Sequence, residues 1–308
     1  MRKLAFHIAE GALSPKAVSD NIDLYTTIIS KKRGENKTHL NAVKAAVEDA
    51  YRGYNAKLSA AAFLEAGFSE PESDALKHCY LSPVEELSNI KGEIFAKSVN
   101  RNTDAEIPCP YCLIGDATTL DHYFPKGTFP EYSAFTPNLV PVCFQCNTRK
   151  RDDWDMMVAR KYLHPFFDNI ELQVVQCTIK KDGVKIYPSY DINTTGIADL
   201  ETARTARTHW NEMALGIRYR RKAARLLGSL LESFLEETDM AALISYCSMH
   251  GRVLARESSN NWQTLLYSAV LQFLGTYGDI SVLKRDVLVF KGTVAAVSMV
   301  LNQVPTGT

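Results

Sequence analysis

Apolar residues recur at helical spacing through most of the first hundred residues. Leu40, Val43 and Val47 follow one another at intervals of three or four, which predicts that they lie on one face of a single helix. The segments 14–34 and 82–100 each begin at a Ser-Pro pair, and proline is favoured in the first turn of a helix. We therefore expect this region to be mostly helical.

A different pattern follows at 171–192. Two runs rich in β-branched residues and tyrosine flank Asp182 and Gly183. An Asp-Gly pair is a favoured turn of a two-residue β-hairpin, so we expect a hairpin here. From about residue 195 the apolar spacing is helical again, except that 281–297 fits a helix and a strand equally well.

These patterns predict an α+β fold that is mainly helical, with a small strand-containing module and a β-hairpin. We divide the chain into an N-terminal helical region at 1–104, the module at 105–168, and a β-hairpin followed by a C-terminal helical region at 169–308. A chain of 308 residues is long enough for one large domain or two modest ones, since a domain usually holds about 100–200 residues.

Composition narrows the classes of function. The chain has 35 Lys and Arg against 35 Asp and Glu, which excludes a generally basic nucleic-acid coat protein but not a local basic patch. No run approaches the roughly 18 uncharged apolar residues of a membrane span, and the interrupted apolar run at the N-terminus is unlike a signal peptide. The single cysteines Cys79, Cys177 and Cys247 are typical of a reducing compartment. We expect a cytoplasmic protein with no membrane partner.

Four of the seven cysteines form two Cys-x-x-Cys pairs, Cys109 with Cys112 and Cys143 with Cys146. Two such pairs can each present two thiolates to one tetrahedral Zn²⁺. A redox site would need one exposed pair near a βαβ unit, whereas this chain has two pairs and no such unit in its pattern. We expect a structural zinc that stabilises a module with little core of its own.

The segment between and after these pairs carries the candidate chemistry. Two strand-like runs, TTLDHYF and NLVPVC, are joined by a loop rich in Pro and Gly and followed by a helix-like segment. The first run contains Asp121 and His122, Asn138 opens the second, and Asn147 directly follows the last cysteine.

This order of strand, loop, strand and helix, with these residues, resembles the HNH or ββα-metal endonuclease family, and the paired cysteines fit its zinc-bearing branch. The closer pattern, LDHYFPK and NLVPVCFQCN followed by HPFFD, is similar to HNH nucleases of bacterial anti-phage and restriction systems, including the Septu-type HNH subunit.

The resemblance implies a role for each residue. His122 would be the general base, because an imidazole can take a proton at neutral pH. Asp121 and Asn147 would give oxygen ligands to one catalytic Mg²⁺ or Mn²⁺. Asn138 would hydrogen-bond backbone across the loop and so fix His122. The third position is Asn147 rather than histidine, and oxygen ligands favour Mg²⁺ or Mn²⁺ over Zn²⁺ at this second metal site.

Basic residues flank the expected cleft. Lys126, Arg149 and Lys150 are candidates for contacts with substrate phosphates. The alternative is a solvated helix face, because acidic residues follow from Asp152 onward. Further along, His164 of the HPFFD segment could be another ligand or a substrate-side group. We favour the alternative, an aromatic anchor in which Phe166 and Phe167 attach the module to the rest of the chain.

The leading hypothesis is a metal-dependent HNH endonuclease that acts on DNA as an effector in bacterial phage defence or restriction. The alternative is a non-catalytic DNA-binding or adaptor protein with a zinc-bound module. Because most of the chain lies outside the motif, we also expect control by a protein partner, such as an ATPase.

Overall fold

The computed structural model describes residues 16–59, 67–97, 99–100, 105–106, 108–154, 160–168, 172–183, 185–255 and 258–290. The chain forms two compact units, each discontinuous in sequence. Unit 1 comprises Met1–Ile170 and Ile197–Met213, and unit 2 comprises Glu171–Gly196 and Ala214–Thr308. The described residues are mainly helical with small two-stranded antiparallel sheets, which confirms the predicted α+β class.

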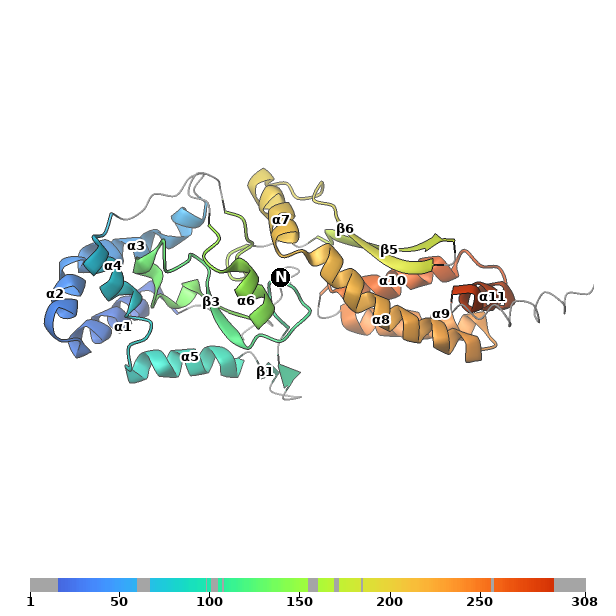
Figure 1. The fold of residues 1–308 in the computed structure, drawn as a ribbon, viewed down its shortest axis with the longest axis horizontal. Coiled ribbons are helices and arrows are strands. Elements are labelled where there is room, and N and C mark those ends of the chain that lie inside the picture. The colour runs from blue at the N-terminus through green and yellow to red at the C-terminus, as the bar shows by residue number, and fades with distance from the viewer. Residues whose placement is uncertain are drawn as a thin grey trace, which may run out of the picture. The chain divides into compact units, whose positions relative to one another are not determined.

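Unit 1 begins with helices and continues into the strand-containing module (Figure 1). Its helices before the module are α1 (Val18–Lys31), α2 (Gly34–Ala42), α3 (Lys44–Leu58), α4 (Glu70–Lys77) and α5 (Glu85–Lys97). The following elements are β1 (Val99–Asn100), β2 (Ala105–Glu106), β3 (Thr119–His122), η1 (Pro130–Tyr132), η2 (Thr136–Asn138), β4 (Leu139–Val142), α6 (Phe144–Lys150) and, later in the chain, α7 (Leu200–Glu212).

The continuous helix expected through Leu40, Val43 and Val47 is instead two helices that meet at Val43. All three residues are buried, but Val43 leaves the helical conformation at φ −96° and ψ 4°. Its N–H still donates to the His39 carbonyl, and its carbonyl still accepts from Val47. Val43 therefore keeps a backbone hydrogen bond to each helix, and both helices keep their apolar faces in the core.

The module has the expected order of strand, loop, strand and helix. β3 pairs antiparallel with β4, with Thr119 opposite Val142 and His122 opposite Leu139, and α6 packs against β3. Antiparallel strands of four residues each cannot bury much apolar surface by themselves, so the module depends on packing against the rest of unit 1.

That packing comes from aromatic side chains of α3. The Tyr51 ring stacks on Phe135 with centroids 4.3 Å apart, and Tyr54 meets Tyr132 and Phe124 edge-on at 5.0 and 5.3 Å. All five rings are buried. Aromatic pairs contribute about 0.5–1.5 kcal/mol beyond their burial, so α3 holds the loop between β3 and β4 in place.

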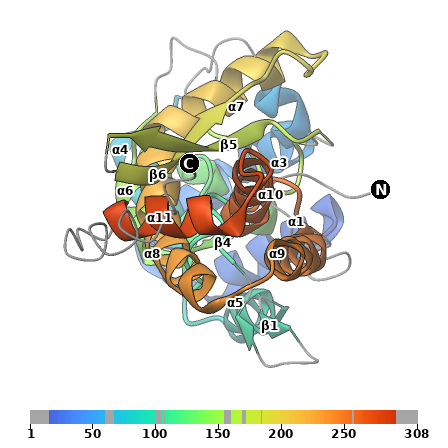
Figure 2. The ribbon, with the colours of Figure 1, turned by 90° about the vertical axis from the view of Figure 1, so that its right-hand side faces the viewer.

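Unit 2 contains a hairpin and helices. The elements are β5 (Val175–Asp182), β6 (Lys185–Ile192), α8 (Leu215–Glu236), α9 (Met240–Ala255), α10 (Trp262–Leu274) and α11 (Ile280–Phe290). Alternate residues of β6 are buried, namely Ile186, Pro188 and Tyr190. α8 packs against β6 and α10 against β5, so the helices cover the apolar face of the hairpin (Figure 2).

The predicted hairpin is confirmed, with its turn one residue later than expected. Asp182 pairs with Lys185, so Gly183 takes the first loop position. Its φ of +55° is readily adopted only by glycine and a few small polar residues. The ambiguous segment at 281–297 is helical as far as Phe290, and the rest of it lies outside the described residues. No helix in the described ranges is long and apolar enough to cross a membrane.

A buried amide in α1 predicts a measurable loss of stability. Asn21 Oδ1 accepts hydrogen bonds from the Thr136 N–H and hydroxyl, each at 2.9 Å, and Asn21 is 1% exposed. Asn21→Ala leaves the Thr136 N–H buried without a partner, so we expect the free energy of unfolding to fall by about 1–3 kcal/mol, measured by urea denaturation. The matched control is Asn41→Ala, an exposed helical asparagine that bonds only to Lys37 O. Equal losses in both variants would contradict this account.

Candidate functional site

Four cysteine thiols converge between the turn at 109–115 and the start of α6. All four side chains are buried, and their sulfur atoms lie within 4.8 Å of one another, in Cys109, Cys112, Cys143 and Cys146. The Sγ atoms of Cys112 and Cys143 are 3.8 Å apart. Tetrahedral zinc with bonds of about 2.3 Å requires sulfur separations of about 3.8 Å, so this thiol cluster could hold a metal ion such as Zn²⁺.

Local backbone geometry creates both halves of the thiol cluster. The N–H of Leu113, whose φ is 53°, donates to the Cys109 carbonyl at 2.8 Å. Cys143 is the N-cap of α6, and its Sγ accepts a bond from the Cys146 N–H. A Cβ at Gly115 would lie 3.2 Å from the Cys143 Cβ, so a larger residue would crowd the cluster. Burial raises the pKa of Cys109, and a bound cation would be needed to keep this thiol ionised.

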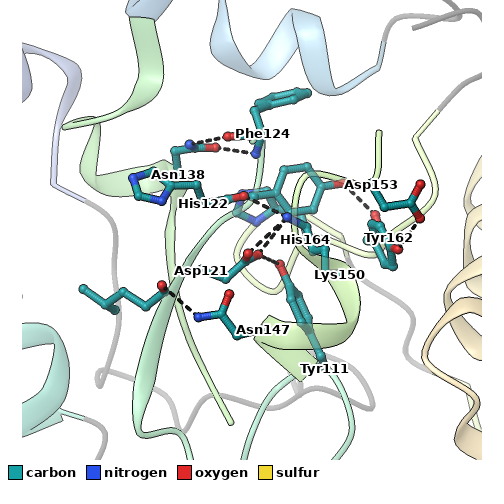
Figure 3. Close-up of polar contacts among 12 residues, drawn as sticks. Tyr111, Asp121, His122, Phe124, Asn138, Asn147, Lys150, Asp153, Tyr162 and His164 are labelled. Atoms are coloured by element: carbon teal, nitrogen blue, oxygen red, sulfur yellow. Dashed lines mark hydrogen bonds and ion pairs between the residues drawn. The ribbon is translucent and has the colours of Figure 1, made fainter. Parts of the chain in front are cut away.

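The hairpin and α6 carry the predicted catalytic residues, and Figure 3 shows the His122 ring directed away from the Asp121 carboxylate. Asp121 and His122 end β3. Asn147, on α6, faces that strand: its Nδ2 donates to Thr119 Oγ1 at 3.1 Å and to the Leu120 carbonyl at 3.3 Å. Figure 3 shows the amide oxygen of Asn147 on the side that faces Asp121.

Asp121 lies in a buried ion pair that the sequence did not reveal. Asp121 is 3% exposed. Its Oδ1 accepts a hydrogen bond from the Lys150 ammonium at 3.2 Å, and the same ammonium lies 3.0 Å from its Oδ2. The Tyr111 hydroxyl donates to the same carboxylate at 2.9 Å. Burial raises the pKa of Asp121, and Lys150 and Tyr111 oppose that rise. Because Tyr111 stands inside the first Cys-x-x-Cys pair, the thiol cluster also positions this hydroxyl.

Lys150 is not available for the phosphate contact predicted from the sequence. It is 0% exposed, and its ammonium also donates to the His122 carbonyl at 2.8 Å. Lys150 is three residues after Asn147, and this spacing puts both side chains on the face of α6 that meets β3.

The other two basic candidates lie apart from this ion pair. Arg149 is exposed, and its Nε donates to the Glu212 carbonyl at the end of α7 at 2.8 Å. Lys126 is half-buried, with its ammonium 5.3 Å from the centre of the Tyr80 ring.

The His122 ring is held by a backbone carbonyl. Its Nε2 is 3.0 Å from Ser133 O; a carbonyl only accepts, so Nε2 carries the proton and Nδ1 keeps its lone pair. The ring also meets Tyr80 edge-on, with centroids 4.5 Å apart. Burial lowers the pKa of His122 to about 3, and nearby ammonium groups such as Lys126 add to this effect. The imidazole is therefore neutral at neutral pH, with Nδ1 unprotonated.

Asn138 bridges the loop between the two strands. Its Oδ1 accepts from the Phe124 N–H at 2.8 Å, and its Nδ2 donates to the Phe124 and Tyr132 carbonyls at 3.0 and 3.3 Å. The Tyr54 hydroxyl of α3 donates to the same Oδ1 at 2.9 Å, and it lies 3.1 Å from His164 Nε2. Asn138 thus makes the bonds across the loop expected from its position, and buried groups outside the motif support it.

Two buried side chains around the site, Tyr54 and Tyr111, are missing from the set inferred from the sequence. Tyr54 lies one turn after Tyr51 on the aromatic face of α3, and this spacing was the available signal. For Tyr111, the sequence offered only its position between Cys109 and Cys112. His164 is 0% exposed and bonds to Tyr54, so it is an internal anchor, as the aromatic reading of HPFFD favoured.

The side-chain oxygen atoms of Asp121 and Asn147 are of the kind that hard cations such as Mg²⁺ prefer as ligands. However, the Lys150 ammonium already neutralises the Asp121 carboxylate. Among the described residues, the Asn147 side chain bonds only through Nδ2. A carboxylate has about four lone-pair positions, and hydrogen bonds from Lys150 and Tyr111 use two of those on Asp121. Any cation held by Asp121 and Asn147 would have to compete with Lys150 for the carboxylate.

Comparisons with known proteins give one short match. A protein of Escherichia phage lambda, described as Protein ea31, is 34% identical over 62 residues, which cover 20% of this chain and 21% of that protein. The match thus spans about a fifth of the length of that relative. No family model matches the chain, and no solved structure matches it.

The thiol cluster predicts one tightly held metal ion per chain. Cys143→Ser should abolish stoichiometric zinc and lower the melting temperature, because binding free energy at such a site is folding free energy. The readouts are metal analysis of protein purified without added metal, and thermal unfolding. Cys177→Ser, at a half-buried cysteine outside the cluster, should keep its zinc. If Cys143→Ser retains both zinc and the wild-type melting temperature, the cluster is not a metal site.

Proposed function

We propose that this protein is a metal-dependent HNH endonuclease that hydrolyses phosphodiester bonds of DNA. The observation that carries the proposal is the state of His122. Its Nε2 is fixed by the Ser133 carbonyl, its Nδ1 keeps a free lone pair, and the oxygen atoms of Asp121 and Asn147 lie on the neighbouring elements. A hydrolase of this kind needs a positioned base next to oxygen ligands for a cation.

Residues of this chain would divide the work as follows. His122 Nδ1 would accept the proton of the attacking water, and the Ser133 carbonyl would stabilise the protonated ring through Nε2. Asn138 would keep the loop, and so Ser133 and His122, in fixed register. Four thiolates would hold a structural Zn²⁺ apart from the reacting atoms.

Asp121 and Asn147 are the residues that would hold Mg²⁺ or Mn²⁺. When bound, such a cation supplies Lewis-acid stabilisation of the charge that develops on the phosphate. Lys150 would weaken cation binding at this site, because its ammonium competes for the Asp121 carboxylate.

One observation favours the second candidate, a non-catalytic DNA-binding or adaptor protein. The Asp121 carboxylate is already neutralised by a fully buried ammonium, and a carboxylate paired in this way can serve a structural purpose alone. A role in bacterial phage defence or restriction, and control by a partner such as an ATPase, rest on the resemblance in sequence.

A plasmid-nicking assay with Mg²⁺ separates the two candidates. His122→Ala removes the base and leaves both proposed cation ligands, so we expect the rate to fall by about 10²–10⁴-fold, the usual contribution of a positioned base. The control is His250→Ala, a half-buried histidine of α9 whose ring lies 5.5 Å from that of Tyr267 in unit 2. Equal rates for the wild type and His122→Ala, or cleavage that persists in EDTA, would refute the nuclease proposal.

The ion pair predicts that Lys150 weakens cation binding. Lys150→Met frees the Asp121 carboxylate, so we expect Mn²⁺ to bind more tightly by calorimetric titration at mildly basic pH. The free energy of unfolding should fall by about 3–5 kcal/mol, because a buried charge loses its partner.

Lys57→Met is the matched control for this titration. Lys57 pairs with buried Glu131 at 3.2 Å, so its loss should also destabilise the chain, yet leave Mn²⁺ affinity unchanged. Weaker Mn²⁺ binding in Lys150→Met would mean that the lysine supports the cation site rather than competes with it.

A further inference from the structure

Two ammonium groups gather on the aromatic ring that contacts His122. Tyr80 follows α4 and meets the His122 ring at 4.5 Å. Lys91 of α5 places its Nζ 3.6 Å from the centre of the Tyr80 ring and donates to the Tyr80 carbonyl. Lys126, from the loop after β3, approaches the same ring at 5.3 Å. Tyr80 and Lys91 precede the thiol cluster in sequence, and Lys126 lies between its two cysteine pairs.

This cluster, defined as Tyr80, Lys91 and Lys126, has no negative partner. Neither lysine forms an ion pair with any carboxylate in the part of the chain that the structure describes, and Asp152, beside Gly127, does not pair with Lys126. Several partly or fully buried lysines of unit 1 are paired, among them Lys57 with Glu131, Lys150 with Asp121 and Lys161 with Asp153. Half-buried Lys32 instead donates to the His78 carbonyl.

Two half-buried like charges on one ring repel each other, and the ring offsets only part of that cost through cation–π attraction. Burial lowers the pKa of Lys91, and the positive charge of Lys126 lowers it further. This direction is the one expected for two ammonium groups that repel each other. An anion beside the two ammonium groups would relieve this repulsion. Such an anion would also lie next to the proposed base.

The anion that best fits this position is a phosphate of a nucleic-acid backbone. Ammonium groups recognise phosphates as point charges, and phosphate contacts set the register of a protein on DNA without reading sequence. A phosphate held by Lys91 and Lys126 would lie on the His122 side of the module, where the strand must run if His122 activates water.

We propose that Tyr80, Lys91 and Lys126 form a phosphate-binding subsite that holds the DNA backbone beside the scissile phosphate. The proposal rests on the nuclease function proposed above and extends it beyond the module. α4 and α5 belong to the N-terminal helices, so these helices would be part of the substrate site and not only a support for the aromatic core.

The test is the salt dependence of DNA binding, measured in the His122→Ala background with a labelled duplex. Each phosphate contact contributes about 0.9 to the slope of log affinity against log salt concentration. Lys91→Met and Lys126→Met should each lower that slope by about one, and the double variant by about two. Lys77→Met is the matched control, a lysine of α4 that pairs with Asp74, and its slope should equal that of the parent.

Lys91→Arg separates a charge effect from a structural one. It keeps a cation over Tyr80, so the slope should stay at the parental value. If Lys91→Met has the parental slope, or if Lys91→Arg loses as much as Lys91→Met, Lys91 makes no phosphate contact and the subsite proposal is overturned.

Failure of the subsite and failure of the nuclease proposal have different signatures. Cleavage by the wild type with unchanged salt slopes in the lysine variants would overturn only the subsite. Duplex binding whose slope depends on Lys91, with no cleavage by the wild type, would support the subsite and refute the nuclease. A wild type that neither binds nor cleaves DNA would overturn both.

Discussion

The convergence of four thiols is the constraint on which the module depends. β3 and β4 have only four residues each, and a hairpin of that length is not stable alone. The thiol cluster joins the turn that carries Tyr111 to the helix that carries Asn147 and Lys150. Asp121 receives hydrogen bonds from both sides of this junction. The geometry around the carboxylate therefore depends on where the thiol cluster places this turn and this helix, as well as on β3.

The loop between the strands has a separate support. Asn138 bonds across it, and the Tyr54 hydroxyl and His164 extend these bonds into α3 and the HPFFD segment. Buried polar groups are costly unless they are satisfied, so this chain of bonds tolerates few alternative arrangements. The loop also provides the Ser133 carbonyl that fixes the ring of His122, and the N-terminal helices thus help to orient the proposed base.

Charge is distributed unevenly around His122 although the whole chain is neutral. On one side, the Lys150 ammonium is cancelled by the Asp121 carboxylate in a fully buried pair. On the other side, Lys91 and Lys126 share the Tyr80 ring without a carboxylate among the described residues. Local fields of this kind depend on which charges meet and not on their sum. The Lys150–Asp121 pair suits a structural role inside the module, whereas Lys91 and Lys126 suit contact with an anion.

The sequence by itself determined the features that have local signals. The spacing of Cys109, Cys112, Cys143 and Cys146 predicts one cluster, alternating and helical periodicities predict the strand–loop–strand–helix order, and Asp182-Gly183 predicts a hairpin. Only the tertiary structure decided that Lys150 is buried against Asp121, that the helix bends at Val43, and that Tyr80 and Lys91 face His122. Periodicity records which face of an element is apolar. It does not record which distant element covers that face, and the partners Tyr54 and Asn138 are 84 residues apart.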